Sequence, residues 1–301
     1  MVERLPIIAA PMFLISGPEL VIACCKAGIV GTFPALNQRT SQGLDEWLVQ
    51  IKSALPPGTR FGVNLIVHPS NTRLQDDLAV LVKHQVPLVI TSLGAVSSVI
   101  DAVHGYGGQV YHDVTTRRHA EKAAAAGVDG LIAVSAGAGG HAGALHPFAL
   151  LHEVKSVFKG PVVLAGAINT GAEVLAAQAL GADAVYMGTR FINTQESQAS
   201  HAYQQMICDS SASDITYTDQ VSGIWGNFLK ASLVGSQARK GSVDLGAELT
   251  ASEQGAKAWK TQWSAGHGVA GIQDVPSVGE LVEQIHQQYV TARQSLLGSQ
   301  A

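Results

Sequence analysis

The sequence predicts a (β/α)8 TIM barrel, an α/β fold, followed by a small and mainly helical C-terminal cap. The length of 301 residues suits a single barrel of this kind, which needs about 250. Short runs rich in Val and Ile recur eight times, and segments with helical periodicity lie between them. An open, doubly wound sheet is the alternative, but eight repeats are more than such a sheet needs.

The eight expected strands are nearly continuous in hydrophobicity and do not alternate, which is typical of parallel strands buried on both faces. Barrel enzymes place ligands at the carboxyl ends of such strands, so the residues that follow each run are the first candidates for a binding site. In chain order the runs are Ile7–Phe13, Ile29–Leu36, Phe61–Val67, Leu88–Leu93, Gln109–Val114, Gly130–Ser135, Val162–Ile168 and Ala184–Phe191.

Seven segments between these runs place apolar residues at helical spacing. Several stop at a glycine, as at Ala27-Gly28, Ala126-Gly127 and Leu180-Gly181, where glycine is favoured because it accepts a positive φ. The expected helices are Pro18–Ala27, Leu44–Ala54, Leu74–His84, Val96–His104, Arg117–Ala126, Pro147–Phe158 and Gly171–Leu180.

The alternation of strands and helices stops after Phe191. We therefore expect three parts: a barrel over residues 1–195, a substrate cap over 196–275 inserted after the last strand, and a C-terminal helix over 276–301 that returns to the barrel. Helical periodicity over Val278–Leu297 supports the last part. Trp225 and Phe228 fall in the cap, and two aromatic residues at this spacing are more often core than pocket wall.

The composition indicates a globular protein without nucleic-acid or membrane partners. Apolar residues make up 47% and charged residues 14%, and the net charge of −4 comes without a basic stripe. No apolar run reaches the ~18 residues of a membrane span, and the first residues lack the apolar segment of a signal peptide. The three cysteines have no spacing typical of disulfide frameworks or zinc sites, so we expect reduced thiols, no metal and a cytoplasmic location. The oligomeric state is left open, a homodimer included.

Small residues at the ends of the last two expected strands predict a phosphate site. Gly166 lies in the last residues of the seventh run and Gly188 in those of the eighth, the two strand ends where barrels of this type grip phosphate. Without side chains in the way, their backbone N–H groups can point at phosphate oxygens, and Thr189 can add a hydroxyl.

The most unusual stretch is Gly137–Gly143, where four glycines in seven residues surround His141. Ordering so many glycines is entropically costly, which indicates a loop that wraps a ligand closely. Histidine is the side chain best suited to move a proton near neutral pH, so we predict a functional role for His141. His112, inside the fifth expected strand, is expected to be structural.

Asp113, an acid at the end of the fifth expected strand, is a second candidate. It is expected to contact a polar cofactor edge or, alternatively, to orient Arg117 or Arg118. Hydrolysis is not favoured, because the sequence has no HExxH, GxSxG or paired-carboxylate pattern. The glycine-rich stretch also matches neither a Walker loop nor a dinucleotide-binding fingerprint.

Taken together and in order, these pieces resemble the nitronate monooxygenase family, formerly called 2-nitropropane dioxygenases. The resemblance runs from Pro6 to about Val282. Its carrying motifs are Ala9-Ala10-Pro11-Met12, Gly62-Val63-Asn64, Gly139-Gly140-His141-Ala142-Gly143, Leu164-Ala165-Gly166-Ala167, Gly181-Ala182-Asp183, Met187-Gly188-Thr189-Arg190-Phe191 and Trp263-Ser264-Ala265-Gly266-His267-Gly268.

The resemblance implies a barrel that binds FMN non-covalently and oxidises alkyl nitronates with O2 to a carbonyl compound and nitrite. It implies that His141 lies beside the flavin and acts as a base toward nitroalkanes, and that Asn64 hydrogen-bonds the flavin. The other residues that it assigns to the cofactor are Ala10, Pro11 and Met12 facing the ring, Gly139 and Gly140 lining the ring or ribityl chain, and Ala165, Gly166, Gly188 and Thr189 at the phosphate.

The chain departs from the family pattern at three places. Asp113 stands where many relatives carry a lysine, and an acid near the flavin disfavours a negatively charged reduced ring. His267 stands where relatives show glutamine. Ser222-Gly223-Ile224-Trp225 replaces a Ser-Gly-Arg-Pro pattern, so the substrate cap differs.

Three other functions stay open. The scaffold also resembles flavin-dependent enoyl-acyl-carrier-protein reductases, which share a Gly-Gly-His loop, and some relatives are similar to NAD(P)H:quinone reductases. A non-catalytic flavin-binding module is the third. Reduction of the flavin by NAD(P)H would favour a reductase, whereas nitronate-dependent O2 uptake without NAD(P)H would favour the monooxygenase.

Overall fold

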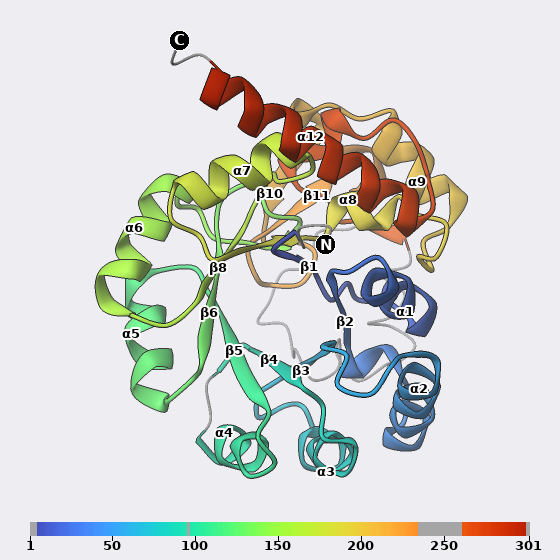
Figure 1. Ribbon diagram of the computed structural model, residues 1–301. Coiled ribbons are helices and arrows are strands. Elements are labelled where there is room, and N and C mark those ends of the chain that lie inside the picture. The colour runs from blue at the N-terminus through green and yellow to red at the C-terminus, as the bar shows by residue number, and fades with distance from the viewer. Residues whose placement is uncertain (1–4, 95–96, 234–260, 299–301) are drawn as a thin grey trace.

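The computed structural model describes residues 5–94, 97–233 and 261–298. Eight parallel strands form a closed barrel, and helices surround it (Figure 1), which confirms the predicted (β/α)8 architecture. The first and last strands close the ring, with Ile8 opposite Tyr186. In order around the barrel the strands are β1 (Ile7–Ala9), β2 (Val30–Pro34), β3 (Gly62–Ile66), β4 (Leu88–Ser92), β5 (Gln109–Val114), β6 (Gly130–Val134), β8 (Val162–Ala165) and β9 (Ala184–Met187).

Each of the seven helices expected between the strands forms. Threonine caps begin several of them; for example, Thr170 Oγ1 accepts from Glu173 N at 3.3 Å in a capping box. The expected helix that began at Val96 is described from Ser97, because Val96 lies outside the described residues. The helices are α1 (Pro18–Lys26), α2 (Ser41–Ala54), α3 (Leu74–His84), α4 (Ser97–His104), α5 (Arg117–Ala126), α6 (Pro147–Val157) and α7 (Gly171–Ala179).

The long last helix, α12 (Val278–Gly298), takes the eighth helical position of the barrel. It lies against α7 and α1 (Figure 1). The approach to α7 is close, since a Cβ added at Gly171 would lie 2.1 Å from the carbonyl oxygen of Ile285. Among the described residues, no helix is both long and apolar enough to cross a membrane.

Several strands are shorter than the apolar runs that predicted them. β8 ends at Ala165 because Gly166 and Ala167 have φ values of +130° and +52°, which turn the chain away from the barrel. β9 ends at Met187, where Gly188 begins the short helix α8 (Thr189–Ile192). The residues of the apolar runs past these strand ends therefore belong to a loop after β8 and to helix α8 after β9.

The described part of the cap combines helix and sheet. Helix α9 (His201–Cys208) is followed by an antiparallel hairpin of β10 (Ile215–Thr218) and β11 (Gly226–Leu229). A two-residue strand, β7 (Gly140–His141), pairs with β11. Residues 234–260 of the expected cap lie outside the described residues.

Within the described part of the chain, three apolar clusters stabilise this arrangement. The largest fills the layer between the strands and the surrounding helices, and a second, which includes Ile90 and Ile132, fills the barrel interior. A third joins the cap to the barrel through Ile192, Ile207 and Val269. Burial of this much apolar surface is the main force that holds the fold together.

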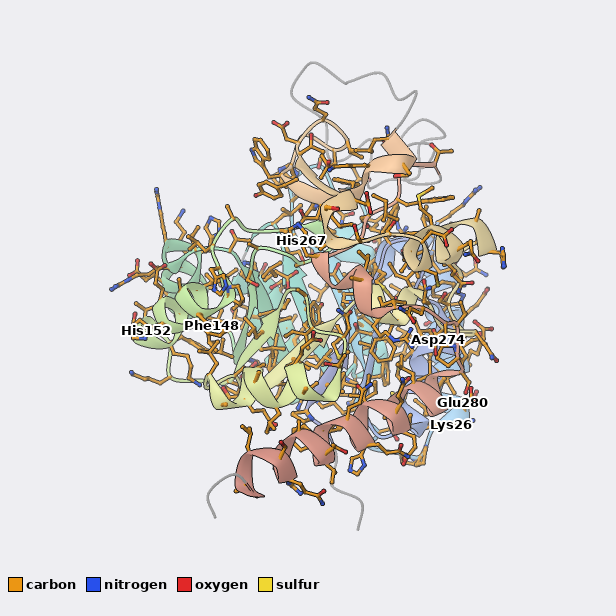
Figure 2. The ribbon with its side chains drawn as sticks, turned by 90° about the horizontal axis from the view of Figure 1, so that it is seen from above. Lys26, Phe148, His152, His267, Asp274 and Glu280 are labelled. Atoms are coloured by element: carbon orange, nitrogen blue, oxygen red, sulfur yellow. The ribbon has the colours of Figure 1, made fainter. Side chains whose placement is uncertain are left out.

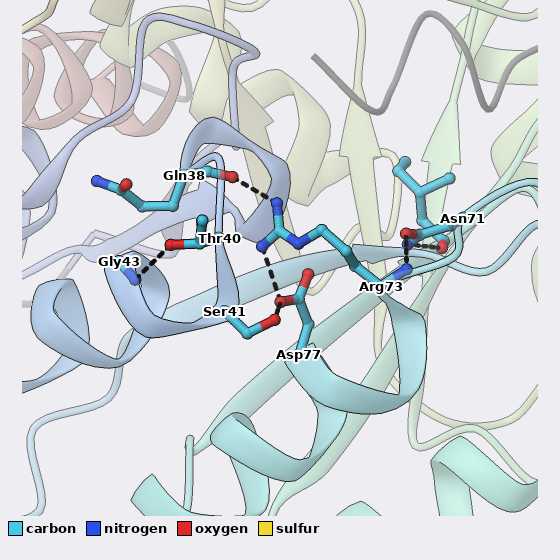
Figure 3. Close-up of polar contacts among 8 residues, drawn as sticks. Gln38, Thr40, Ser41, Gly43, Asn71, Arg73 and Asp77 are labelled. Carbon is cyan, nitrogen blue, oxygen red and sulfur yellow. Dashed lines mark hydrogen bonds and ion pairs between the residues drawn. The ribbon is translucent and has the colours of Figure 1, made fainter. Parts of the chain in front are cut away.

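An arginine-centred network fixes two loops beside the barrel mouth (Figure 3). Arg73 donates to the Gln38 carbonyl at 2.6 Å and to Asp77 Oδ1 at 2.8 Å, and Ser41 donates to the same carboxylate oxygen at 2.6 Å. Asn71 Nδ2 donates to the Ile66 carbonyl at 2.9 Å. The segments that follow β2 and β3 are therefore tied to each other.

Candidate active site

A cavity of about 1340 Å³ opens at the carboxyl ends of the barrel strands. It exceeds the ~300–1,000 Å³ of most small-ligand sites, so it has room for more than one bound molecule. The structure brings all of the sequence-predicted site residues into the lining of this cavity. They are Ala10, Pro11, Met12, Asn64, Asp113, Gly139, Gly140, His141, Ala165, Gly166, Gly188 and Thr189.

His141 is held in the cavity wall by the cap. It lies on β7, opposite Gly226 of β11, and its Nε2 lies 2.9 Å from Ser222 Oγ. The Ser222 hydroxyl donates to the Ile224 carbonyl at 3.3 Å, so its oxygen accepts from Nε2–H. This arrangement assigns the ring proton to Nε2 and makes Nδ1 the basic nitrogen. The stretch predicted as a wrapping loop is thus a short strand at its histidine, because β11 pairs with it.

The imidazole of His141 is neutral at physiological pH. Burial lowers its pKa from 6.5 to about 4, since a dry environment disfavours the imidazolium cation. A neutral imidazole can accept a proton or a hydrogen bond from a bound molecule. An anion bound beside the ring would raise this pKa again, because opposite charges favour each other.

Asp113 ends a chain of hydrogen bonds that crosses three strands. Asn64 Nδ2 donates to Ser92 Oγ at 2.7 Å, and Ser92 Oγ donates to Asp113 Oδ2 at 2.5 Å. Among the described residues, the other carboxylate oxygen, Oδ1, has no hydrogen-bond partner although it is buried, and the same holds for the hydroxyl of Tyr186 on β9. Both residues line the cavity. A buried polar atom without a hydrogen-bond partner lowers the stability of the fold by about 1–3 kcal/mol. The two atoms therefore favour the binding of a ligand whose polar edge can hydrogen-bond to them.

The electrostatics link Asp113 and Tyr186. Burial raises the pKa of Asp113 to about 6, partly offset by the Ser92 hydrogen bond. Burial raises the pKa of Tyr186, and the negative charge of Asp113 raises it further. The alternative role of Asp113, orienting an arginine, is not seen for Arg117, which instead pairs with Glu121 at 2.9 Å.

The opposite side of the cavity is made of backbone and small residues. At Gly166 only glycine fits, because φ is +130° and a Cβ would lie 2.3 Å from Ser135 Oγ. At Gly188 a Cβ would project into space bounded by Ala10 and Met12, whose nearest atoms lie 3.6 and 3.8 Å away. Thr189 Oγ1 accepts from Gly266 N at 2.9 Å, which leaves its hydroxyl proton for a ligand.

The segment Ser264–Gly268 returns from the cap and packs backbone to backbone on the glycine-rich stretch. His267 N donates to the Gly137 carbonyl at 3.0 Å, and a Cβ at Gly139 would lie 2.8 Å from Gly266 N. Figure 2 shows His267 between the barrel and the cap strands. Glycine at 139 is thus required by this close approach, in addition to lining the cavity.

The residues present fit FMN. Orphaned polar atoms at Asp113 and Tyr186 match a heterocycle with hydrogen-bonding edges, and the side-chain-free surface at Gly166 and Gly188 matches a phosphate that is gripped by backbone. The cavity is also large enough for a flavin together with a substrate.

Comparison with known proteins assigns the family. The family described as nitronate monooxygenase matches residues 62–288, which is most of the chain. The chain belongs to the nitronate monooxygenase family. It is therefore an oxidoreductase, and the family resemblance seen in the sequence motifs is confirmed.

Relatives within and near the nitronate monooxygenase family differ in their named reactions. A (3aS,4S,5R,7aS)-5-hydroxy-7a-methyl-1-oxo-octahydro-1H-indene-4-carboxyl-CoA dehydrogenase of Rhodococcus jostii is 29% identical over 79% of this chain and 66% of its own length. A nitronate monooxygenase of Paraburkholderia phytofirmans is 28% identical over 72% of this chain and 71% of its own. The chain thus spans about two thirds of the length of these curated relatives.

Solved structures of similar proteins cover nearly the whole chain. FabK from Thermotoga maritima is 26% identical with a TM-score of 0.82, over 98% of this chain and 96% of that one. A nitroalkane oxidase from Streptomyces ansochromogenes is 27% identical with a TM-score of 0.83, over 98% of both. Nitronate monooxygenases therefore share this scaffold with proteins that carry other names.

Sequence reasoning missed several residues of the site. Ser222 was not predicted, because nothing local in a Ser-Gly turn reveals a partner 81 positions away. Tyr186 could have been found from the sequence, because it is a polar residue directly before Met187, near the end of the eighth expected strand. Trp225 lines the cavity while Phe228 is fully buried core, so the two aromatics have different roles. His112, expected to be structural, also lines the cavity, and its Nδ1 lies 2.7 Å from Thr91 Oγ1.

Proposed function

We propose that this protein is an FMN-dependent nitronate monooxygenase, which oxidises alkyl nitronates with O2 to a carbonyl compound and nitrite. The observation that carries the proposal is the neutral His141, held by Ser222 in the wall of a cavity whose far side is backbone and glycine. Membership of the nitronate monooxygenase family supports the reaction, and the nitroalkane oxidase likeness supports the substrate class.

In this proposal residues 1–195 hold the cofactor and the described parts of 196–275 close the substrate side. Gly166, Gly188 and Thr189, with Ala165, would hold the FMN phosphate through backbone N–H groups and a hydroxyl. Ala10, Pro11 and Met12 would face the ring, with Gly139 and Gly140 on its other border. Asn64 and Asp113 would hydrogen-bond its polar edge, and Tyr186 would join them, because its buried hydroxyl has no hydrogen-bond partner in the described part of the chain.

His141 would handle the proton on the substrate side. Its Nδ1 can take the proton from the carbon next to the nitro group of a neutral nitroalkane, which leaves the nitronate anion. The imidazolium formed would be stabilised by that anion, while Ser222 keeps the ring oriented through Nε2–H. A substrate that arrives already as a nitronate would need only a hydrogen bond from this ring.

The overall reaction balances without a second reductant. Two nitronates and one O2 give two carbonyl compounds and two nitrite ions, as the carbon–nitrogen bond breaks and the carbon gains an oxygen. When bound, the flavin supplies the electron transfer between nitronate and O2. The chain's own residues bind and orient the nitronate, exclude bulk water and move one proton at His141 Nδ1.

A second function, an NAD(P)H-dependent flavin reductase of the enoyl-acyl-carrier-protein or quinone type, has its own support. The likeness to FabK covers 98% of the chain, and a relative of similar identity is named a CoA dehydrogenase. The cavity of about 1340 Å³ is also large enough for an elongated substrate beside a cofactor.

An anaerobic reduction experiment separates the two functions. The protein is purified, its absorbance spectrum is recorded, and NADPH, NADH and then propionate 3-nitronate are added without oxygen. We expect flavin bands that bleach with the nitronate and not with either nicotinamide. Fast bleaching by NADPH or NADH would move the assignment to a reductase. Protein that shows no flavin even after FMN is added would refute both.

A further inference from the structure

Two aromatic rings of the cap form a stacked pair at the cavity. The rings of Tyr217 and Trp225 lie 5.0 Å apart between centroids with 28° between their planes. Both line the cavity, and 52% of Trp225 remains exposed although Tyr217 covers part of its surface. A large apolar ring left half in the open inside a binding cavity is a surface that a ligand can cover.

The pair is fixed to the segment that carries His141. Tyr217 Oη donates to the Ala142 carbonyl at 3.0 Å, and Ala142 N donates to the Trp225 carbonyl at 3.2 Å. Ala142 is the residue after His141, and His141 itself is paired with Gly226, the residue after Trp225. The stacked rings and the imidazole therefore belong to one hydrogen-bonded unit, and a group bound on the rings would be held at a set place relative to His141.

The cavity has more room than a cofactor and a short nitronate require. Its lining away from Asp113 and the histidines is largely apolar, as at Ile66, Leu93 and Leu145. A nitronate of two or three carbons would leave the Tyr217–Trp225 pair uncovered. A substrate that reaches the pair must carry a larger apolar group.

We propose that Tyr217 and Trp225 form a subsite that stacks a flat aromatic ring of the substrate, so that aryl-substituted nitronates are the preferred substrate class. This inference rests on the proposed function. Aromatic rings favour offset stacking at centroid distances of about 4.5–7 Å, so a ligand ring on Trp225 would extend the existing Tyr217–Trp225 stack. A saturated ring of the same size is puckered and cannot make the same contact, so flatness is the property that this subsite selects.

The first experiment measures binding alone. Phenylacetate and cyclohexylacetate are titrated by calorimetry into the protein as purified with its cofactor, because their planar carboxylate mimics the nitronate group without reacting. We expect phenylacetate to bind about tenfold more tightly, equal to about 1.4 kcal/mol. In Trp225→Ala this preference should fall below threefold, while Trp225→Phe should keep most of it.

A matched control uses another exposed aromatic residue. Phe148 is 62% exposed on α6 and lies well apart from the cap strands in Figure 2, so Phe148→Ala should leave the preference unchanged. Equal affinity of the two acids for the wild-type protein, or a preference that survives Trp225→Ala, would overturn the inference. If Trp225→Ala keeps the preference for phenylacetate but elutes later from gel filtration than the wild-type protein, the aromatic pair forms a contact between two copies of the chain. That outcome would also overturn the inference.

The second experiment measures turnover with the nitronates of phenylnitromethane and of (nitromethyl)cyclohexane. The ratio of their kcat/KM values should favour the phenyl compound about tenfold and should collapse in Trp225→Ala. If neither nitronate is turned over but the phenylacetate preference is present and depends on Trp225, the proposed function fails and the subsite stands. If both are turned over equally well, the proposed function stands and the subsite fails.

Discussion

His141 Nε2 and Ser222 Oγ lie 2.9 Å apart although 81 residues separate them in the sequence. The contact joins a histidine of the barrel mouth to a serine of the cap, and it fixes which ring nitrogen carries the proton. Ser222 is 1% exposed, so water does not compete for this hydrogen bond. The reactive face of the histidine is therefore set by the cap rather than by the barrel.

Removing the imidazole should abolish proton transfer without loss of the cofactor. We expect His141→Ala to keep its flavin bands but to lose at least about a hundredfold of kcat on neutral nitroalkanes, the usual contribution of a positioned base. Turnover of preformed nitronates should fall much less, because they need no deprotonation. Steady-state oxygen uptake with both substrate forms checks this. His152→Ala, an exposed histidine of α6 (Figure 2), is the matched control, and equal losses in both variants would contradict the role.

The pH dependence of the same reaction follows from burial of His141. Its pKa of about 4 means that the base stays unprotonated down to acidic pH, so kcat/KM for a neutral nitroalkane should stay level from pH 7 to about 5 and fall below it. A fall in kcat/KM with its midpoint near pH 6.5 would instead show that the histidine is solvated. The unfolded chain protonates this ring near 6.5, so folding stability itself declines as pH falls from 6.5 toward 4, and circular dichroism must be recorded at each pH.

Ser222 should act as a positioning residue. Ser222→Ala leaves a buried Nε2–H without its acceptor, and we expect kcat on neutral nitroalkanes to fall about tenfold with little change in KM. Ser222→Thr restores a hydroxyl and should recover most of the rate. A change in KM alone, or no recovery in the threonine variant, would indicate a packing effect on the cap.

A side chain at Gly188 should block the proposed phosphate site without harming the fold. Its Cβ would meet Ala10 and Met12 only at 3.6 Å or beyond, so Gly188→Val is tolerated by the protein and occupies cavity space instead. We expect folded, colourless protein with FMN affinity lowered at least a hundredfold, measured by fluorescence titration. Gly279→Ala on α12, where nothing lies within 4 Å of the added carbon, is the control. A fully yellow Gly188→Val protein would refute the phosphate assignment.

Asp113 should tune the reduction potential of the bound flavin. A negative charge beside the ring disfavours the anionic reduced form, so Asp113→Asn should raise the potential. The interaction between the Asp113 charge and a charged ring a few ångströms away is worth a few kcal/mol at an effective dielectric of ~20. Since 1.4 kcal/mol equals ~30 mV for a two-electron couple, we expect the reduction potential to rise on the order of 50 mV.

The pKa of Asp113 supplies the control for that measurement. Because burial raises it to about 6, the carboxyl is protonated at pH 5 and charged at pH 8. Potentials of the wild-type protein and Asp113→Asn should therefore converge at pH 5 and differ at pH 8. A difference that is equal at both values would show that the asparagine acts by shape and not by charge.

Much of the barrel could be predicted because its signals are local. A run such as Val162–Ile168 is apolar throughout since both faces of the strand are buried, and a glycine after a helix marks its end. The strand ends were placed a few residues too far, because an apolar residue such as Ile168 is buried as well in a loop as in a strand. The hydrophobicity of a residue indicates that it is buried, but it does not indicate whether its backbone forms the hydrogen bonds of a strand.

The site was predictable where it depends on strand ends and not where it depends on the cap. Gly166 and Gly188 follow strands and Asp113 lies near the carboxyl end of β5, so the barrel topology alone brings them to one cavity. The pairing of β7 with β11 joins residues more than 80 positions apart, and no periodicity marks a two-residue strand. Ser222 and Tyr217 therefore became visible only in three dimensions.

The position of α12 has a consequence for how such a protein can change. Because this helix completes the ring against α7 and α1, the segment between α8 and α12 enters and leaves on one side of a barrel that is already closed. In the proposed function, the residues that would hold the cofactor precede that segment, whereas Ser222, Tyr217 and Trp225 lie within it. Recombination that exchanges this one segment would replace the residues of the proposed substrate side in a single step. The barrel residues proposed to bind the cofactor would stay unchanged.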